Sequence, residues 1–225
     1  MSLPSEIESS EPPEGDAHRI SKTNALGALD EYYRRIHRRI YLSAELPIYY
    51  PAEAMFAPDL IAVRDVEIHE RNSWIVSQEG KGIDFALEIR VLGRARKDLE
   101  LNVERFARLG ISEYFAFDVR TGRVLGWRLP TPGTVRYEPV ASCAGRWPSR
   151  VLELDLALDE GRLRFYAGSA PLLDARELID KLSSMVDQAV CRAEDEARRA
   201  EDEARRADRL AARLRELGVD PDAIE

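Results

Sequence analysis

The apolar positions of this chain follow different periods in different stretches, and each period predicts one kind of element. Between residues 24 and 40 they recur every three or four positions, which is the spacing of one face of an amphipathic helix. These positions are Leu26, Leu29, Tyr33, Ile36 and Ile40. Runs of strand length and strand composition follow at 41–50, 60–66 and 83–92. The last run is apolar almost throughout, which predicts a strand that is buried on both faces.

A second helical pattern follows the third predicted strand, and Gly110 stands where a left-handed cap would end it. The apolar face of this helix comprises Leu99, Val103, Phe106 and Leu109. A Thr-Gly turn and a later hairpin connect further predicted strands, at 113–119, 121–129, 134–140 and 150–166. The order of strands, helix and strands, closed by antiparallel hairpins, predicts a mixed sheet in an α/β fold.

In the last quarter of the chain the apolar positions alternate four and three residues apart, which is typical of a coiled-coil helix. They are Val186, Val190, Ala193, Ala197, Ala200, Ala204, Ala207, Ala211 and Leu214. The sequence RAEDEAR occupies 192–198 and is repeated directly at 199–205. The expected acid-first ion pairs are Glu194–Arg198, Asp195–Arg199, Glu201–Arg205 and Asp202–Arg206. Because an alanine seam buries little area, a self-associating helix and a solitary helix stabilised by charge pairs both remain open.

Composition divides the chain into segments. Residues 1–20 are rich in Ser, Glu, Pro and Gly and are expected to be disordered, because they bury too little to offset chain entropy. An α/β domain is predicted over 21–172, the heptad-patterned helix over 173–217 and a tail over 218–225. The first residues lack the features of a signal peptide, and no run reaches the ~18 apolar residues of a membrane span. A cytoplasmic protein is therefore expected.

Histidine and cysteine are few and scattered. Cys143 and Cys191 lie far apart, and none of His18, His37 and His69 has a neighbouring His or Cys at metal-ligand spacing. We therefore expect ordinary core or surface positions for all five side chains.

The net charge of −8 excludes a generic nucleic-acid binder, because contacts to phosphate need clustered Lys and Arg. A local basic run at 90–97 is the candidate contact to DNA, through Arg94, Arg96 and Lys97. The alternative is that these side chains are solvated or pair with nearby acids. Binding of nucleic acid without cleavage is a further possibility, and such binding would weaken steeply with salt.

Two acids stand at predicted strand positions. Asp59 begins the strand at 60–66, and Glu88 lies within the apolar strand at 83–92. Burying a carboxylate among apolar neighbours is costly unless it is paired or binds a metal. Two carboxylates that meet at neighbouring strand ends could bind Mg²⁺ through oxygen ligands and support hydrolysis of a phosphodiester. The alternative is that Asp59 caps a turn and Glu88 pairs with an arginine such as Arg90.

Several fragments occur in an order that is more specific than any one of them. They are IYLSAELPIYYP, APDLIAV, GKGIDFALEI, DLELNVERFARLGISEYFAFDV, PSRVLELDLALDEGRLRFY and the ending RLRELGVDPD. Together they resemble the Uma-two family of restriction endonucleases, part of the PD-(D/E)XK nuclease superfamily, over most of 25–225. The resemblance implies a restriction-endonuclease-like mixed β-sheet flanked by helices. It also implies that Asp59 and Glu88 are the metal-binding acids and that Asp98 occupies an acidic position of the family.

The chain departs from the family pattern at its catalytic positions. One helical turn after the acidic position, members usually carry the Lys assigned to catalysis, whereas this chain has Asn102; the usual Tyr one turn later is Phe106. An amide neither accepts a proton at neutral pH nor supplies positive charge. Arg90, two residues after Glu88, and Lys97 are conceivable replacements, although arginine is a poor general base.

The resemblance and the departures from it leave two candidate functions. The first is a nuclease fold with impaired catalysis that acts as an assembly or interaction module, forming a homo-oligomer through 176–217. The second is an active Mg²⁺-dependent DNA endonuclease that hydrolyses phosphodiester bonds. The first is favoured by Asn102 and the acidic net charge, and the second by the retained acids.

Overall fold

The computed structural model describes residues 15–90 and 95–218, with the backbone alone for 95–98. The helices are α1 (Asp16–Arg35), α2 (Val76–Glu79), α3 (Ala95–Arg108) and α4 (Ala175–Glu216). The strands are β1 (Ile40–Ser43), β2 (Ile48–Tyr49), β3 (Leu60–Arg64), β4 (Trp74–Ile75), β5 (Phe85–Arg90), β6 (Glu113–Asp118), β7 (Arg123–Arg128), β8 (Glu138–Pro139), β9 (Arg146–Ser149), β10 (Leu154–Asp159), β11 (Arg162–Ala167) and β12 (Ala170–Pro171). The chain forms two compact units, residues 1–175 and 176–225.

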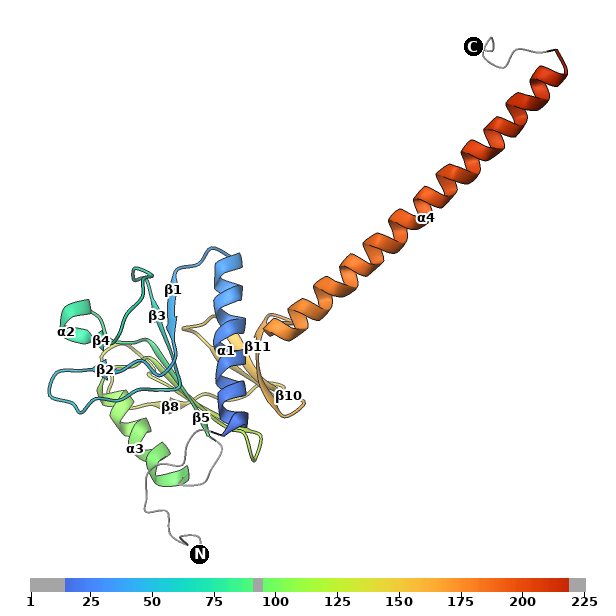
Figure 1. Cartoon of the computed structure of the whole chain (residues 1–225). Coiled ribbons are helices and arrows are strands. Elements are labelled where there is room, and N and C mark those ends of the chain that lie inside the picture. Colours follow the sequence, from blue (N-terminus) through green and yellow to red (C-terminus); the bar gives the residue numbers. More distant parts are fainter. Residues whose placement is uncertain (1–14, 91–94, 219–225) are drawn as a thin grey trace, which may run out of the picture. The chain divides into compact units, whose positions relative to one another are not determined.

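The first unit is built around a mixed sheet whose described strands have the order β1-β3-β5-β6-β7-β8. Figure 1 labels β1, β3, β5 and β8 of this sheet. The neighbours β5 and β6 are parallel and are joined by α3, because a parallel pair needs a crossover connection. The other neighbouring pairs are antiparallel. This is the mixed sheet of an α/β fold that the order of elements predicts.

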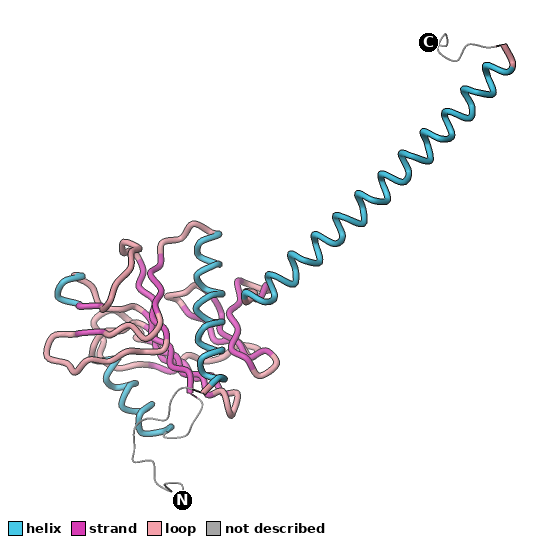
Figure 2. The backbone as a smooth tube through the Cα atoms, viewed as in Figure 1, coloured by secondary structure: helices cyan, strands magenta, loops and turns pink. Residues whose placement is uncertain are grey.

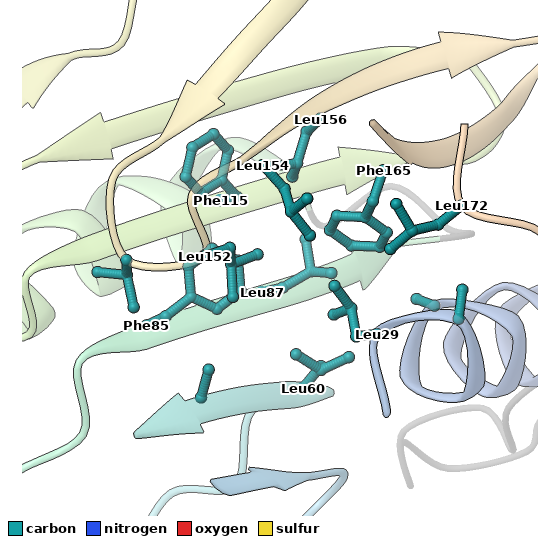
Figure 3. Close-up of a cluster of buried hydrophobic side chains, with 14 of the residues drawn as sticks. Leu29, Leu60, Phe85, Leu87, Phe115, Leu152, Leu154, Leu156, Phe165 and Leu172 are labelled. Atoms are coloured by element: carbon teal, nitrogen blue, oxygen red, sulfur yellow. The ribbon is translucent and has the colours of Figure 1, made fainter. Parts of the chain in front are cut away.

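One face of the central sheet packs against α1 and against a second antiparallel sheet with the order β12-β11-β10-β9. Figure 3 shows the apolar side chains that meet there, among them Leu29, Leu60, Phe85, Leu87, Phe115, Leu154, Leu156 and Phe165. This face is therefore covered by a helix and a sheet together, and not by helices alone.

The opposite face of the central sheet packs against α3 and the short β2–β4 pair. Its buried side chains include Phe106 and Ala107 of α3, Ile48 of β2, Trp74 of β4, and Ala86 and Tyr114 of the sheet. Successive residues of β5 thus enter different clusters, with Phe85, Leu87 and Ile89 on the α1 side and Ala86 on the α3 side. The prediction that this strand is buried on both faces is confirmed.

The two sheets are also joined by a buried charge. Glu113, at the start of β6, is 1% exposed. Its carboxylate accepts hydrogen bonds from Nε of Arg128 at 2.6 Å and from the backbone N–H of Arg150 at 2.8 Å, as well as from Val151 N–H and the Ser149 hydroxyl. These donors satisfy a carboxylate that would otherwise be costly to bury.

The structure corrects two predicted boundaries. Helix α1 begins at Asp16, so 16–20 are helical and not part of a disordered segment; residues 1–14 lie outside the described range. The predicted strand at 41–50 is two strands, because β1 pairs with β3 whereas β2 pairs in parallel with β4. Between them Glu45 adopts a left-handed backbone conformation with φ 52°, which ends the extended run.

The second unit contains nearly all of α4, and Figure 2 shows this helix without interruption. Its 42 residues include no buried side chain. Of the expected ion pairs, Glu201–Arg205 is formed at 3.8 Å, whereas Arg198 pairs with Asp195 one turn back. Among the described helices, none is long and apolar enough to cross a membrane.

Substitution of a glycine in β7 tests the packing of the central sheet. Gly126 of β7 lies directly opposite Phe115, and an added Cβ would approach the Phe115 ring to 2.5 Å. We expect Gly126→Ala to lower the free energy of unfolding by ~1–3 kcal/mol through overpacking, measured by urea denaturation.

Gly27, an exposed residue of α1, is the matched control because nothing lies within 4 Å of its added Cβ. Gly27→Ala should stabilise the protein by ~0.5–1 kcal/mol, as expected inside a helix. Equal effects of the two substitutions would contradict the described contact.

Candidate active site

Strand pairing places Asp59 and Glu88 side by side. Leu60 of β3 is paired with Leu87 of β5, and the next position outward on each chain is Asp59 and Glu88. Because β3 and β5 are antiparallel, the start of one and the end of the other share an edge of the sheet. The parallel strand β6 also ends at this edge, which is where α/β sheets commonly bind ligands.

The Asp59 carboxylate is fixed through both of its oxygens. Oδ2 accepts the backbone N–H of Ile89 at 2.6 Å, and Oδ1 lies 2.9 Å from Nε2 of His18. The His18 and Asp59 side chains are both about nine-tenths buried, at 10% and 11% exposure. This contact orients the acid without using its remaining lone pairs, since a carboxylate has about four acceptor positions.

Sequence reasoning missed the pairing of His18, which was expected to have an ordinary core or surface position. The residue is far from Asp59 along the chain, so metal-ligand spacing could not reveal it. The signal was the helical period itself, because the buried face of α1 runs back from Leu29 through Ala25 and Lys22 to His18. Starting the helix at Asp16 would have placed His18 on the side that faces the sheet.

A lysine also reaches this region from α1. Lys22, one turn after His18, is 7% exposed, and its Nζ lies 2.6 Å from Oε1 of Glu45. The backbone N–H of Glu45 donates to the carbonyl of Pro58, the residue before Asp59. An ammonium group therefore lies close to the start of β3, but it arrives from the helix before the sheet and is engaged by a carboxylate.

Helix α3 contributes an amide and a phenyl ring. Asn102 is half-buried, and Phe106, one turn later, is fully buried and packs edge-on against Tyr114 with ring centroids 5.0 Å apart. Neither residue supplies charge or a hydroxyl group. The neighbouring strand β6 instead presents the hydroxyl of Tyr114, a residue that the sequence analysis did not single out.

The pKa of Tyr114 reports how closely the site residues gather. Burial raises this pKa most, and the Glu88 and Asp59 carboxylates raise it further, while Asn102 and Arg90 lower it. The hydroxyl is buried and, within the described residues, makes no well-aligned hydrogen bond, although the Asn102 side chain lies close to it. Asp59, Glu88, Arg90 and Asn102 are therefore all near enough to the Tyr114 hydroxyl to affect its pKa.

The remaining predicted residues are placed only in part. Arg94 lies outside the described residues, and Arg96, Lys97 and Asp98 belong to the first turn of α3 with their backbone alone described. The DNA contacts of Arg94, Arg96 and Lys97 and the family role of Asp98 stay predictions.

Asp59 and Glu88 fit as a partial site for Mg²⁺. Within the described ranges, no group of three or more His, Cys, Asp or Glu side chains is arranged to hold a metal ion. Mg²⁺ is commonly bound by only one or two carboxylates, completed by waters and substrate phosphates. The Tyr114 hydroxyl, whose pKa both carboxylates raise, is a buried oxygen without a well-aligned partner in the same region.

Two Tyr→Phe substitutions test the state of the Tyr114 hydroxyl. Tyr114→Phe removes a buried group without a well-aligned bond, so the free energy of unfolding should stay unchanged or rise by up to ~1 kcal/mol. In the matched control, the Tyr137 hydroxyl donates to the carbonyl of Ile111 at 2.7 Å. Tyr137→Phe should therefore cost ~1 kcal/mol in urea denaturation. A loss as large in Tyr114→Phe would show that its hydroxyl is bonded after all.

Comparison with known proteins agrees with the fold described above. A solved structure titled "Crystal structure of a putative nuclease belonging to DUF820 from Anabaena variabilis ATCC 29413" superimposes with a TM-score of 0.52 and 13% identity, covering 67% of this chain and 82% of that one. At that identity the likeness shows the fold alone. No curated protein matches the chain. The family model of Uma2, described as "Putative restriction endonuclease", matches residues 6–160, which is more than half of the sequence. The chain therefore belongs to the Uma2 family, the Uma-two family that its sequence resembles.

Proposed function

We propose that this chain is a nuclease-fold protein with impaired catalysis that serves as an assembly or interaction module through α4. The observation that supports impaired catalysis is the kind of side chain that α3 contributes to the site. The described α3 side chain close to the Tyr114 hydroxyl is the amide of Asn102, and not an amine, and the Glu88 and Asp59 carboxylates act on the same hydroxyl.

The missing amine matters for the chemistry. Restriction-endonuclease-like proteins generally use Mg²⁺, which would be held by Asp59 and Glu88 and would supply polarisation of the phosphate and activation of water. The attacking water must still lose a proton, and the negative charge that develops must be offset. An amide does neither, because it accepts no proton at neutral pH and carries no charge.

The residues of α1 do not replace the missing group. His18 Nε2 lies against Asp59 Oδ1, where it orients that acid. Lys22 is engaged by Glu45 at 2.6 Å. This contact engages the Lys22 ammonium at a carboxylate other than those of Asp59 and Glu88.

The second candidate is an active Mg²⁺-dependent DNA endonuclease. It is favoured by the adjacent carboxylates and by Arg90, which ends β5 close enough to lower the pKa of Tyr114. A guanidinium can offset charge on a phosphate, but it is a poor general base. In this reading Arg94, Arg96 and Lys97 would contact the DNA backbone.

The two candidates differ in a cleavage assay on supercoiled plasmid with Mg²⁺ or Mn²⁺. We expect no metal-dependent cleavage by the wild type. Asn102→Lys should create cleavage, because it adds a cationic amine at the position of the amide. The added activity should be lost in Asn102→Lys/Glu88→Ala, which removes a metal ligand.

Asn102→Gln is the matched control, because it changes the length of the side chain while keeping an uncharged amide; it should remain inactive. Cleavage by the wild type that disappears in Glu88→Ala would overturn the proposal of impaired catalysis and establish the second candidate.

A further inference from the structure

The apolar stripe of α4, here called the seam, has acids on both sides. The seam consists of Val186, Val190, Ala193, Ala197, Ala200, Ala204, Ala207, Ala211 and Leu214, which are alternate a and d positions of a heptad. The e and g positions next to it hold the flank acids Asp187, Glu194, Glu196, Glu201, Glu203 and Asp208. The other flank positions between 187 and 210 are Ala189 and Leu210, so neither flank carries a cation there.

The seam and its surroundings are open to solvent in the described chain. No residue of α4 is buried, and five large apolar side chains in its first half are at least half exposed. They are Ile179, Leu182, Met185, Val186 and Val190. An apolar stripe of this length on a charged helix is expected to face another helix.

The arginines of α4 leave most of the flank acids uncompensated. Arg198 pairs with Asp195 at 3.7 Å and Arg205 with Asp202 at 2.7 Å, and both of these acids lie away from the seam. Arg205 also lies 3.8 Å from Glu201. Among the residues that the structure describes, Glu194, Glu196 and Glu203 form no ion pair. The charge beside the seam is therefore negative and available to a partner.

A second copy of α4 fits this surface poorly. In a parallel pair the g position of one helix faces the e position of the other, and in an antiparallel pair like positions face each other. Both arrangements set Glu against Glu or Asp along the repeat. Like charges at these positions are destabilising, and an alanine seam contributes little apolar burial to offset them.

We propose that the seam of α4 docks a helix of a different protein, one with Lys or Arg at its flanks and bulky apolar residues along its own seam. Basic flanks would pair with the six acids, and large side chains would fill the space that the alanines leave. The inference rests on the assembly half of the proposed function and is independent of the active site. It also replaces the predicted homo-oligomer through 176–217 by a mixed pair.

The test uses two labelled synthetic helices of ~28 residues, or four heptads, with Ile at a and Leu at d. One carries Lys at every e and g position and the other carries Glu there. Fluorescence anisotropy with the full chain should show binding of the Lys helix, with the Glu helix at least ~10-fold weaker. The difference should shrink in ~1 M salt, where charges are screened within about 3 Å.

Two variants of the full chain separate docking from mere charge attraction. Ala197→Glu/Ala204→Glu makes α4 more acidic but spoils the seam, so docking predicts at least ~10-fold weaker binding of the Lys helix, whereas charge attraction alone predicts equal or tighter binding. Replacing Glu194, Glu196, Glu201 and Glu203 with Lys should reverse the preference between the two helices.

The outcomes also distinguish this inference from the proposed function. Equal affinity for both helices, or a wild-type homodimer in light scattering that survives the four Glu→Lys changes, would overturn the mixed pair and leave an assembly role intact. A monomeric chain that binds neither helix would overturn both. Nuclease activity of the wild type would overturn only the impaired site.

Discussion

The central constraint in this protein is the burial of β5 on both faces. Its odd-numbered residues pack under α1 and the second sheet, and Ala86 packs under α3. A strand in this position cannot shift its register by one residue without moving each side chain to the other face. Glu88 and Arg90 are the polar residues of this strand, so their position is set by the same apolar pattern that fixes the core.

That pattern explains why the candidate site lies where it does. The register that packs Leu60 beside Leu87 also places Asp59 beside Glu88. Helix α1 then orients Asp59 through His18, and α3 brings Asn102 to the phenol of Tyr114. The scaffold of the candidate site is thus assembled by packing, and the described α3 side chain close to the Tyr114 hydroxyl is the amide of Asn102.

Much of the fold could be predicted from sequence, because a strong periodic pattern of apolar residues is compatible with only one kind of element. The apolar run of β5 and the α3 face that includes Phe106 each predict an element and its buried side, and the heptads of α4 predict a long helix. The order of the fragments that resemble the family added a prediction that periodicity cannot make, namely that two acids on separate strands lie at the same edge of the sheet. The adjacency of Asp59 and Glu88 followed from that order and from no spacing between them.

Other features depend on tertiary contacts that leave a weak trace in sequence. Polar residues at the start of α1 hide its helical period, so the buried contact of His18 with Asp59 was missed. The run at 41–50 has strand composition throughout, and only the turn at Glu45 sends its halves to different sheets. Tyr114 resembles any core aromatic until its surroundings are known.

The buried carboxylate of Glu113 has a consequence for how this architecture can be divided. Its strand lies in the central sheet, yet three of its hydrogen-bond donors come from 149–151, at the entrance to the second sheet. A fragment that ended after β8 would contain all the described strands of the central sheet. The buried Glu113 carboxylate would nevertheless lack those three donors. The shortest fragment that keeps these hydrogen bonds therefore extends beyond β8 to residue 151, so the two sheets form one folding unit.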